Sequence, residues 1–119
     1  MSKRSALTNK LDKLASILVR SKGKCVRCGN DQYEKLQCCH IYSRTYRSVR
    51  WYLDNLLCLC AGCHFWGHKN PLEFAEFVKN YLGELRYEQL KSVAISTKKW
   101  TIEELKQLKK AFQKVINEL

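Results

Sequence analysis

Two pairs of cysteines share the spacing Cys-x-x-Cys, one at Cys25 and Cys28 and the other at Cys60 and Cys63. Each pair can offer two thiolates from one turn, and four such sulfurs make a tetrahedral Zn²⁺ site. The total of seven cysteines is odd, which suits metal ligation better than a disulfide framework. Because a site with four cysteine ligands has no open coordination position, we expect this zinc to stabilise the fold and to take no part in chemistry.

Two other interpretations of these pairs are ordinary buried cysteines and a thioredoxin-like redox motif. One Cys-x-x-Cys pair can arise by chance, but two pairs that flank a histidine-rich segment rarely do. A redox motif of this kind would need a βαβ pattern around it, and neither pair has one. The sequence therefore favours the zinc site.

All three histidines of the chain lie between residues 40 and 68. His64 and His68 are four residues apart, so on a helix their side chains share one face and can bind one divalent ion together. His40 ends a predicted strand, and a neutral imidazole can accept a proton from water near pH 7. One metal ion and one base suffice for phosphodiester hydrolysis. A single histidine is more often a surface or core residue than a ligand, but three in this order, with Asn55 between them, favour a functional site.

A set of residues in this region is arranged as in a known nuclease motif. In chain order they are Cys39-His40, Asn55, Cys60-Ala-Gly-Cys63-His64 and His68. The chain thereby resembles the HNH endonucleases (ββα-metal or His-Me finger nucleases), in their version framed by Cys-x-x-Cys pairs. The resemblance implies hydrolysis of DNA phosphodiester bonds in which His40 is the general base and Asn55 orients it. It also implies that His64 and His68 bind a catalytic Mg²⁺ or Mn²⁺, which places His64 among the catalytic residues.

Cys39 departs from the family pattern, in which a carboxylate or another histidine usually precedes the base. A thiolate is a soft ligand and favours Zn²⁺ over Mg²⁺ or Mn²⁺. Either Cys39 joins the catalytic metal site, where Zn²⁺ would then be suited, or it stays out and water takes that place. Cys39 also supports an alternative function, a non-catalytic zinc-containing DNA-binding protein with a degenerate HNH site.

A looser resemblance covers roughly residues 25–115. The tail reads Leu85-Arg-Tyr-Glu-Gln-Leu-Lys and then Lys99-Trp-Thr-Ile-Glu-Glu-Leu-Lys. It is similar to the C-terminal part of the phage NinG recombination proteins, which process branched DNA. This resemblance implies a phage-type protein that acts on branched or recombination DNA.

Basic residues outnumber acidic ones by 22 to 11, which gives a formal charge of +11. So large an excess implies a polyanionic partner, most often nucleic acid. A membrane surface is the lesser alternative because no lipidation signal accompanies the charge. An RNA-cleaving toxin or RNA-binding module is a third class of function that the charge allows.

The positive charge is concentrated in two stretches. Residues 1–24 hold seven basic side chains against one acidic side chain, and residues 36–53 hold arginines but no acid. The side chains predicted to contact DNA phosphates are Arg44, Arg47, Arg50 and Lys69. Phosphate contacts position a protein without reading sequence, so we expect duplex or branched DNA to be cut independently of its sequence. Trp51, in the same stretch, is expected to fill the core instead.

The elements that must position these residues follow from hydrophobic spacing and from helix start and stop signals. Helices are predicted over 5–21, from Cys60 through His68, from Asn70-Pro71 with Asn70 as the N-cap, over 84–95, and from the capping box Thr101 to Glu104. Strands are predicted over 33–41 and 56–59, with a loop over 42–52.

These elements predict an α+β fold in one compact domain. A basic N-terminal helix (1–24) and a C-terminal helical extension (71–119) flank a small ββα-metal core (25–70) with its four-cysteine zinc site. No apolar run reaches the ~18 residues that a membrane span requires, and no signal-peptide pattern follows Met1. We therefore expect a cytoplasmic protein of a bacterial or phage-infected cell, without a membrane partner.

Overall fold

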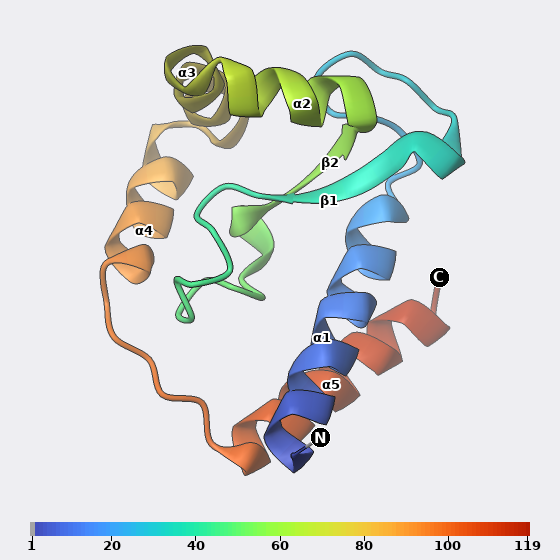
Figure 1. Cartoon of the computed structure of the whole chain (residues 1–119), viewed down its shortest axis with the longest axis vertical. Helices are drawn as coiled ribbons and strands as arrows, with labels where there is room; N and C mark the ends of the chain where they lie inside the picture. Colours follow the sequence, from blue (N-terminus) through green and yellow to red (C-terminus); the bar gives the residue numbers. More distant parts are fainter. Residues whose placement is uncertain (1) are drawn as a thin grey trace.

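A computed structural model describes residues 2–119 and shows a mixed α/β fold, with five α-helices and a two-stranded sheet in that range (Figure 1). The helices are α1 (Lys3–Arg20), α2 (Ala61–Lys69), α3 (Pro71–Leu82), α4 (Glu84–Ala94) and α5 (Ile102–Asn117). The strands are β1 (Leu36–His40) and β2 (Leu56–Cys60). The mixed class expected from the sequence is confirmed. None of the helices is both long and apolar enough to cross a membrane.

The first helix begins earlier than predicted. The Ser2 side chain accepts a hydrogen bond from the backbone N–H of Ser5 at 3.0 Å, so Ser2 caps α1 and Lys3 is its first residue. The helix ends at Arg20, and Gly23 follows with a φ of 80°, a left-handed conformation that favours glycine. Gly23 therefore turns the chain toward the first cysteine pair, close to the predicted end of this helix at residue 21.

The two strands form an antiparallel hairpin in which Leu36 lies opposite Cys60 and His40 lies opposite Leu56. The predicted strand over 33–41 is wrong at its start, because Tyr33–Lys35 is a short 3₁₀ helix. Leu36 pairs with Cys60, the last residue of β2, and α2 begins at the next residue. Residues before Leu36 therefore have no partner strand for their backbone groups. They satisfy those groups locally instead.

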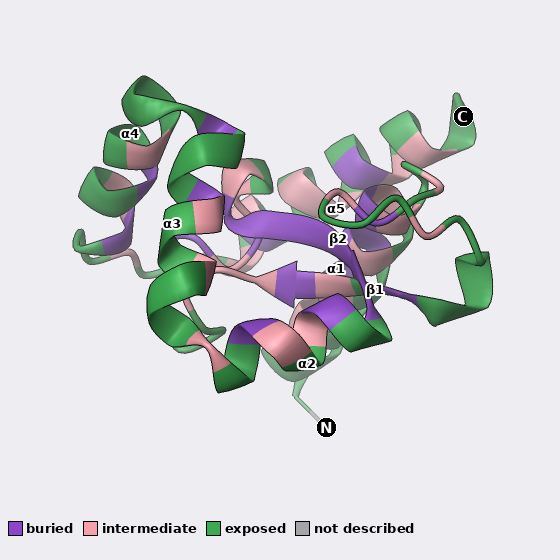
Figure 2. Cartoon of the chain, turned by 90° about the horizontal axis from the view of Figure 1, so that it is seen from above, coloured by how far each residue is buried: buried purple, intermediate pink, exposed green. Residues whose placement is uncertain are grey.

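The sheet lies between α1 and α2 (Figure 1). All five residues of β2 are buried, as the continuous purple ribbon of Figure 2 shows. A strand that is covered on both faces accounts for the unbroken apolar run of its sequence. The hairpin is thus a fixed platform, and the residues that end β1 and start α2 are held by it.

The C-terminal helices differ from prediction at one cap. Pro71 is the first residue of α3 as expected, but Asn70 makes no side-chain bond to that helix. Its Nδ2 instead donates to the Trp66 carbonyl at 3.0 Å, which closes the end of α2. The capping box of Thr101 and Glu104 is present at the start of α5. α5 then packs on α1, which brings helices from the two ends of the sequence together, with the starts of α1 and α5 at the same end of the molecule (Figure 1).

Candidate functional site

Four cysteine side chains converge where the first cysteine turn meets the start of α2. The Sγ atoms of Cys25, Cys28, Cys60 and Cys63, called the thiol cluster below, all lie within 4.8 Å of one another. The Cys28 and Cys60 sulfurs are 3.6 Å apart. A tetrahedral Zn²⁺ with Zn–S bonds of about 2.3 Å places its sulfurs about 3.8 Å apart. The thiol cluster therefore fits a metal ion such as zinc, with the ligands that the sequence predicts.

Two N–H donors point at sulfurs of the thiol cluster. The backbone N–H of Cys63 donates to Cys60 Sγ at 3.4 Å, and Arg27 Nη1 donates to Cys63 Sγ at 3.4 Å. The Arg27 guanidinium also lies 3.4 Å from the centre of the Trp66 ring, which fixes its orientation. Sequence analysis missed Arg27, although its place inside the first Cys-x-x-Cys turn is a signal that could have pointed to it.

The thiols of the cluster differ in acidity. Burial opposes ionisation of Cys25, but the backbone N–H groups of Cys28, Cys60 and Arg27 outweigh it and lower the pKa of the Cys25 thiol to about 6. Burial, with the neighbouring sulfurs, raises the pKa of Cys63 to about 12. A bound divalent cation would favour the thiolate form of all four, so metal binding here should release protons.

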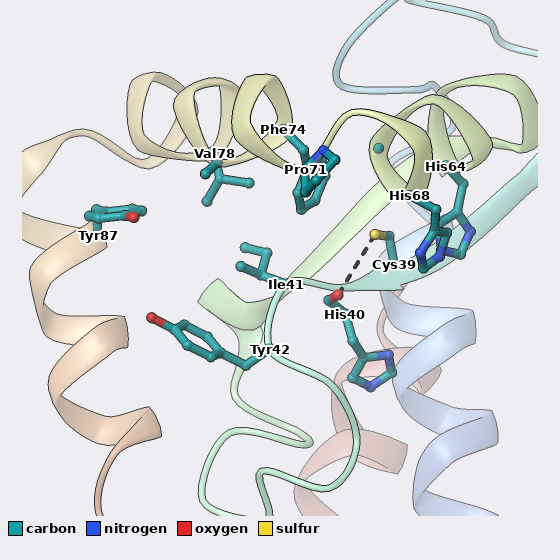
Figure 3. Close-up of a pocket in the computed structure, with 12 residues that line it drawn as sticks. Cys39, His40, Ile41, Tyr42, His64, His68, Pro71, Phe74, Val78 and Tyr87 are labelled. Carbon is teal, nitrogen blue, oxygen red and sulfur yellow. Dashed lines mark hydrogen bonds between the residues drawn. The ribbon is translucent and has the colours of Figure 1, made fainter.

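A cavity of about 380 Å³ lies beside the end of β1, between α2, α3 and α4 (Figure 3). The three histidines and Cys39 line it together with apolar side chains that include Phe74. We call it the histidine cavity. Figure 3 shows Cys39 Sγ on the same side of β1 as His64 and His68, whereas the His40 ring points to the other side. The structure thus places all four predicted residues in the lining of one cavity, but their side chains do not converge on a single position.

His64 and His68 are neighbours on α2, with ring centroids 5.0 Å apart. His64 Nδ1 lies 2.6 Å from Gln37 Oε1, so the ring donates there and keeps the lone pair of Nε2 for a ligand. Burial and the nearby His68 lower the pKa of His64, which favours the neutral form that binds metals. Gln37 was missed by sequence analysis. Its signal is strand alternation, because Gln37 and Cys39 share one face of β1.

Cys39 is 4% exposed, and burial raises the pKa of its thiol to about 12. Its Sγ faces the backbone carbonyl of His40 at 3.9 Å (Figure 3). Within residues 2–119 the thiol cluster is the one group of three or more potential ligands that is close enough to hold an ion. The histidine pair therefore offers two ligand atoms, and whether Cys39 adds a third stays a prediction.

His40 has a defined tautomer. Its Nε2 lies 3.2 Å from the backbone carbonyl of Arg50, and a carbonyl can only accept, so Nε2 carries the proton and Nδ1 has a free lone pair. Burial and the positive charge of Arg44 lower the pKa of His40 below its ordinary value. The ring is therefore neutral near pH 7, which is the form that a general base requires.

Asn55 is fully buried and clamps the loop that follows β1. Its Nδ2 donates to the carbonyls of Tyr42 and Val49, both at 3.0 Å, and its Oδ1 accepts from the Tyr42 backbone N–H at 2.7 Å. It forms no hydrogen bond to His40 in the described chain. Any orienting effect on His40 therefore passes through the loop, since Val49 is the neighbour of Arg50, whose carbonyl holds the His40 ring.

The four side chains predicted to contact DNA divide into two groups. Arg44, Arg47 and Lys69 are exposed, which leaves them accessible to a phosphate. Arg50 instead forms a two-fold hydrogen-bonded ion pair with Asp12, at 2.7 and 3.1 Å, and its side chain is 16% exposed. A phosphate contact would have to break this pair, so we do not propose one for Arg50. Trp51 is buried as predicted and donates to the same carboxylate at 2.9 Å.

Gly67 lies on α2 between His64 and His68, lines the histidine cavity and faces Phe74 of α3. A Cβ atom at this position would lie 2.8 Å from Phe74 Cδ1, closer than van der Waals contact allows. Glycine therefore lets the Phe74 ring pack directly on the α2 backbone. A larger residue at 67 would push α3 away from the cavity.

Comparison with protein families matches the whole chain, residues 1–119, to the model described as the bacteriophage lambda NinG protein. The chain belongs to the NinG family. This confirms the looser of the two resemblances and identifies a phage protein related to recombination. No curated protein and no solved structure matches the chain. The HNH interpretation of this NinG-family chain therefore depends on the site itself.

Proposed function

We propose that the chain is a metal-dependent HNH-type endonuclease that hydrolyses DNA phosphodiester bonds. The observation that carries the proposal is that residues His40, His64 and His68 line one cavity, where His40 is neutral with a lone pair on Nδ1, although its ring points to the other side of β1. A proton acceptor and a pair of imidazoles that can bind a divalent ion together suffice for hydrolysis of a phosphodiester. The ββα order of the elements that hold them agrees with the core expected for this nuclease class.

His40 would act on the attacking water. Nδ1 accepts the proton of the water as its oxygen bonds to phosphorus, while the Arg50 carbonyl keeps the other ring nitrogen protonated. Asn55 keeps that carbonyl in place through the loop. Burial and then the positive charge of Arg44 lower the pKa of the ring, so the base is unprotonated at neutral pH.

His64 and His68 would hold the divalent ion, with Gln37 orienting the ring of His64. When bound, a Mg²⁺ or Mn²⁺ ion would neutralise charge on the phosphate and assist departure of the leaving oxygen. Burial raises the pKa of the Cys39 thiol, which disfavours a thiolate ligand for a hard ion, so Cys39 would stay outside the set of residues that hold it.

Exposed cations near the cavity support a DNA substrate. Arg44 and Arg47 lie on the loop after β1, and Lys69 ends α2 beside the histidine pair. Arginine can contact phosphate in a bidentate manner, and none of these contacts requires a particular base. Membership of the NinG family favours branched or recombination DNA in a phage-infected cell as the setting.

The deciding experiment incubates supercoiled plasmid with the protein and Mg²⁺, Mn²⁺ or Zn²⁺, or with a chelator. Four-way junctions, linear duplex and RNA are offered in parallel. We expect cleavage of DNA with Mg²⁺ or Mn²⁺ and none after chelation. Tight DNA binding without cleavage under every ion would instead support the second candidate, a non-catalytic DNA-binding protein, which the buried thiol of Cys39 favours.

A further inference from the structure

The first and last helices build a basic groove away from the histidine cavity. α1 and α5 pack side by side, and the start of each lies at the end of the molecule opposite α2 and α3 (Figure 1). The groove between them has a volume of about 720 Å³. The charged residues that line it are Lys3, Lys10, Glu103, Lys106, Lys109 and Lys110. We call it the lysine groove, and it shares no lining residue with the histidine cavity.

Within the described chain, the charge of the five lysines that line the lysine groove is offset only in part, by Glu103. The described residues form three ion pairs, and none of these pairs involves a lysine that lines the groove. Glu103, its acidic lining residue, accepts a hydrogen bond from Gln107 at 3.0 Å. Five ammonium groups gathered around one groove repel each other, which costs stability unless an anion binds. The two basic segments come from opposite ends of the sequence, so folding itself creates this concentration of charge.

We infer that the lysine groove is a second DNA-binding surface, which holds the phosphate backbone of a DNA arm outside the cleavage site. The inference uses the proposed function only to choose DNA among polyanions. Lysines act as mobile point charges that suit a phosphate backbone without reading its sequence. The molecule is 37 Å long, about 11 base pairs of duplex, so DNA that reaches both surfaces must extend well beyond the scissile bond.

The test compares two triple variants that each remove three positive charges. The groove variant carries Lys10→Gln, Lys106→Gln and Lys110→Gln, all exposed positions. The control carries Lys35→Gln, Lys79→Gln and Lys91→Gln, which are also exposed but line neither the lysine groove nor the histidine cavity. Binding of a duplex of about 30 base pairs is followed by fluorescence anisotropy over a range of salt, without added divalent ion.

We expect the groove variant to bind at least about tenfold more weakly than the control at low salt, and its salt slope to fall by about two units more. Equal weakening in both variants would overturn the inference, because bulk charge would then explain the effect. Groove-dependent binding to phosphatidylserine vesicles with unchanged DNA affinity would overturn it too. If the groove variant melts early, Lys106→Gln with Lys110→Gln replaces it. A parent protein that binds DNA through the groove but never cuts would refute the proposed nuclease alone.

Discussion

The thiol cluster and the histidine cavity share helix α2, where Cys63 and His64 are adjacent, yet they are built differently. Four sulfurs converge within 4.8 Å in the thiol cluster, and three of its cysteines are buried. In the histidine cavity His68 is exposed, and the His40 ring points away from the other two histidines (Figure 3). A closed set of ligands suits a structural ion, whereas an open set leaves room for water and a phosphate. One short helix can therefore anchor the fold with its first turn and present reactive groups from the next.

The largest expected effect concerns the thiol cluster, whose set of ligands is closed. Cys60→Ser removes one of four zinc ligands, so we expect loss of the bound ion and unfolding, since a structural zinc site contributes about 10 kcal/mol or more. Elemental analysis and circular dichroism measure both. Cys38→Ser is the matched control, because Cys38 lies on β1 outside the thiol cluster and its substitution should leave the zinc content unchanged. Folded protein without zinc would remove the structural role from the cluster.

The histidine cavity depends on the loop after β1, and Asp12 holds that loop through its bonds to Arg50 and Trp51. Hydrogen bonds from Arg50 and Trp51 outweigh the effect of burial and lower the pKa of Asp12, so its stabilisation is present at neutral pH and is lost as pH falls below the ordinary value of 3.8. Asp12→Ala leaves the Arg50 charge nearly buried and should cost about 3 kcal/mol in urea unfolding. Asp54→Ala breaks a pair whose arginine is 52% exposed and should cost less than about 1 kcal/mol. Equal costs would show that the Asp12 pair has no special role.

Cys39 lines the histidine cavity but is of the same residue type as the ligands of the thiol cluster. Its substitution therefore tests whether the histidine cavity uses a thiol ligand. If its thiol is a ligand of the catalytic ion, Cys39→Asp should shift the preference of the cleavage reaction from Zn²⁺ toward Mg²⁺, because a carboxylate is a hard ligand. The buried position and raised pKa of Cys39 make us expect little change in preference instead. Cleavage rates over a series of Mg²⁺, Mn²⁺ and Zn²⁺ concentrations distinguish the two outcomes.

The smallest expected effect is a shift in the pH dependence of cleavage. Burial lowers the pKa of His40 first, and Arg44 lowers it further. A base works only above its pKa, so cleavage should decline below the ordinary value of 6.5 as the ring gains a proton. Arg44→Ala should move this decline to higher pH in single-turnover cleavage at saturating DNA. Arg47→Ala is the control, and an identical shift there would mean that the effect is general.

Features set by local spacing could be predicted from the sequence. A Cys-x-x-Cys turn brings two sulfurs together whatever surrounds it, and a four-residue step on a helix puts His64 beside His68. The capping box of α5 is likewise local and is present. These predictions depend on backbone geometry within one or two turns, which the sequence determines almost directly.

Contacts between distant segments could not be predicted in this way. Asp12 and Arg50 are 38 residues apart, and nothing in either segment marks the partner. The same holds for the lysine groove, which exists only because α5 packs on α1. The direction of the His40 ring is decided by the Arg50 carbonyl, hence by the loop that Asn55 clamps.

The central claim is that His40 is the base of a DNA-cleaving site, and cleavage by His40→Ala tests it most directly. The parent and variant proteins are compared for single-turnover plasmid cleavage with Mg²⁺ or Mn²⁺, after zinc content and duplex affinity have been measured for both. We expect unchanged zinc and affinity but a rate lower by ~10²–10⁴-fold, the usual contribution of a positioned general base. Cleavage by His40→Ala at the parent rate would contradict the assignment and, with it, the proposed nuclease mechanism.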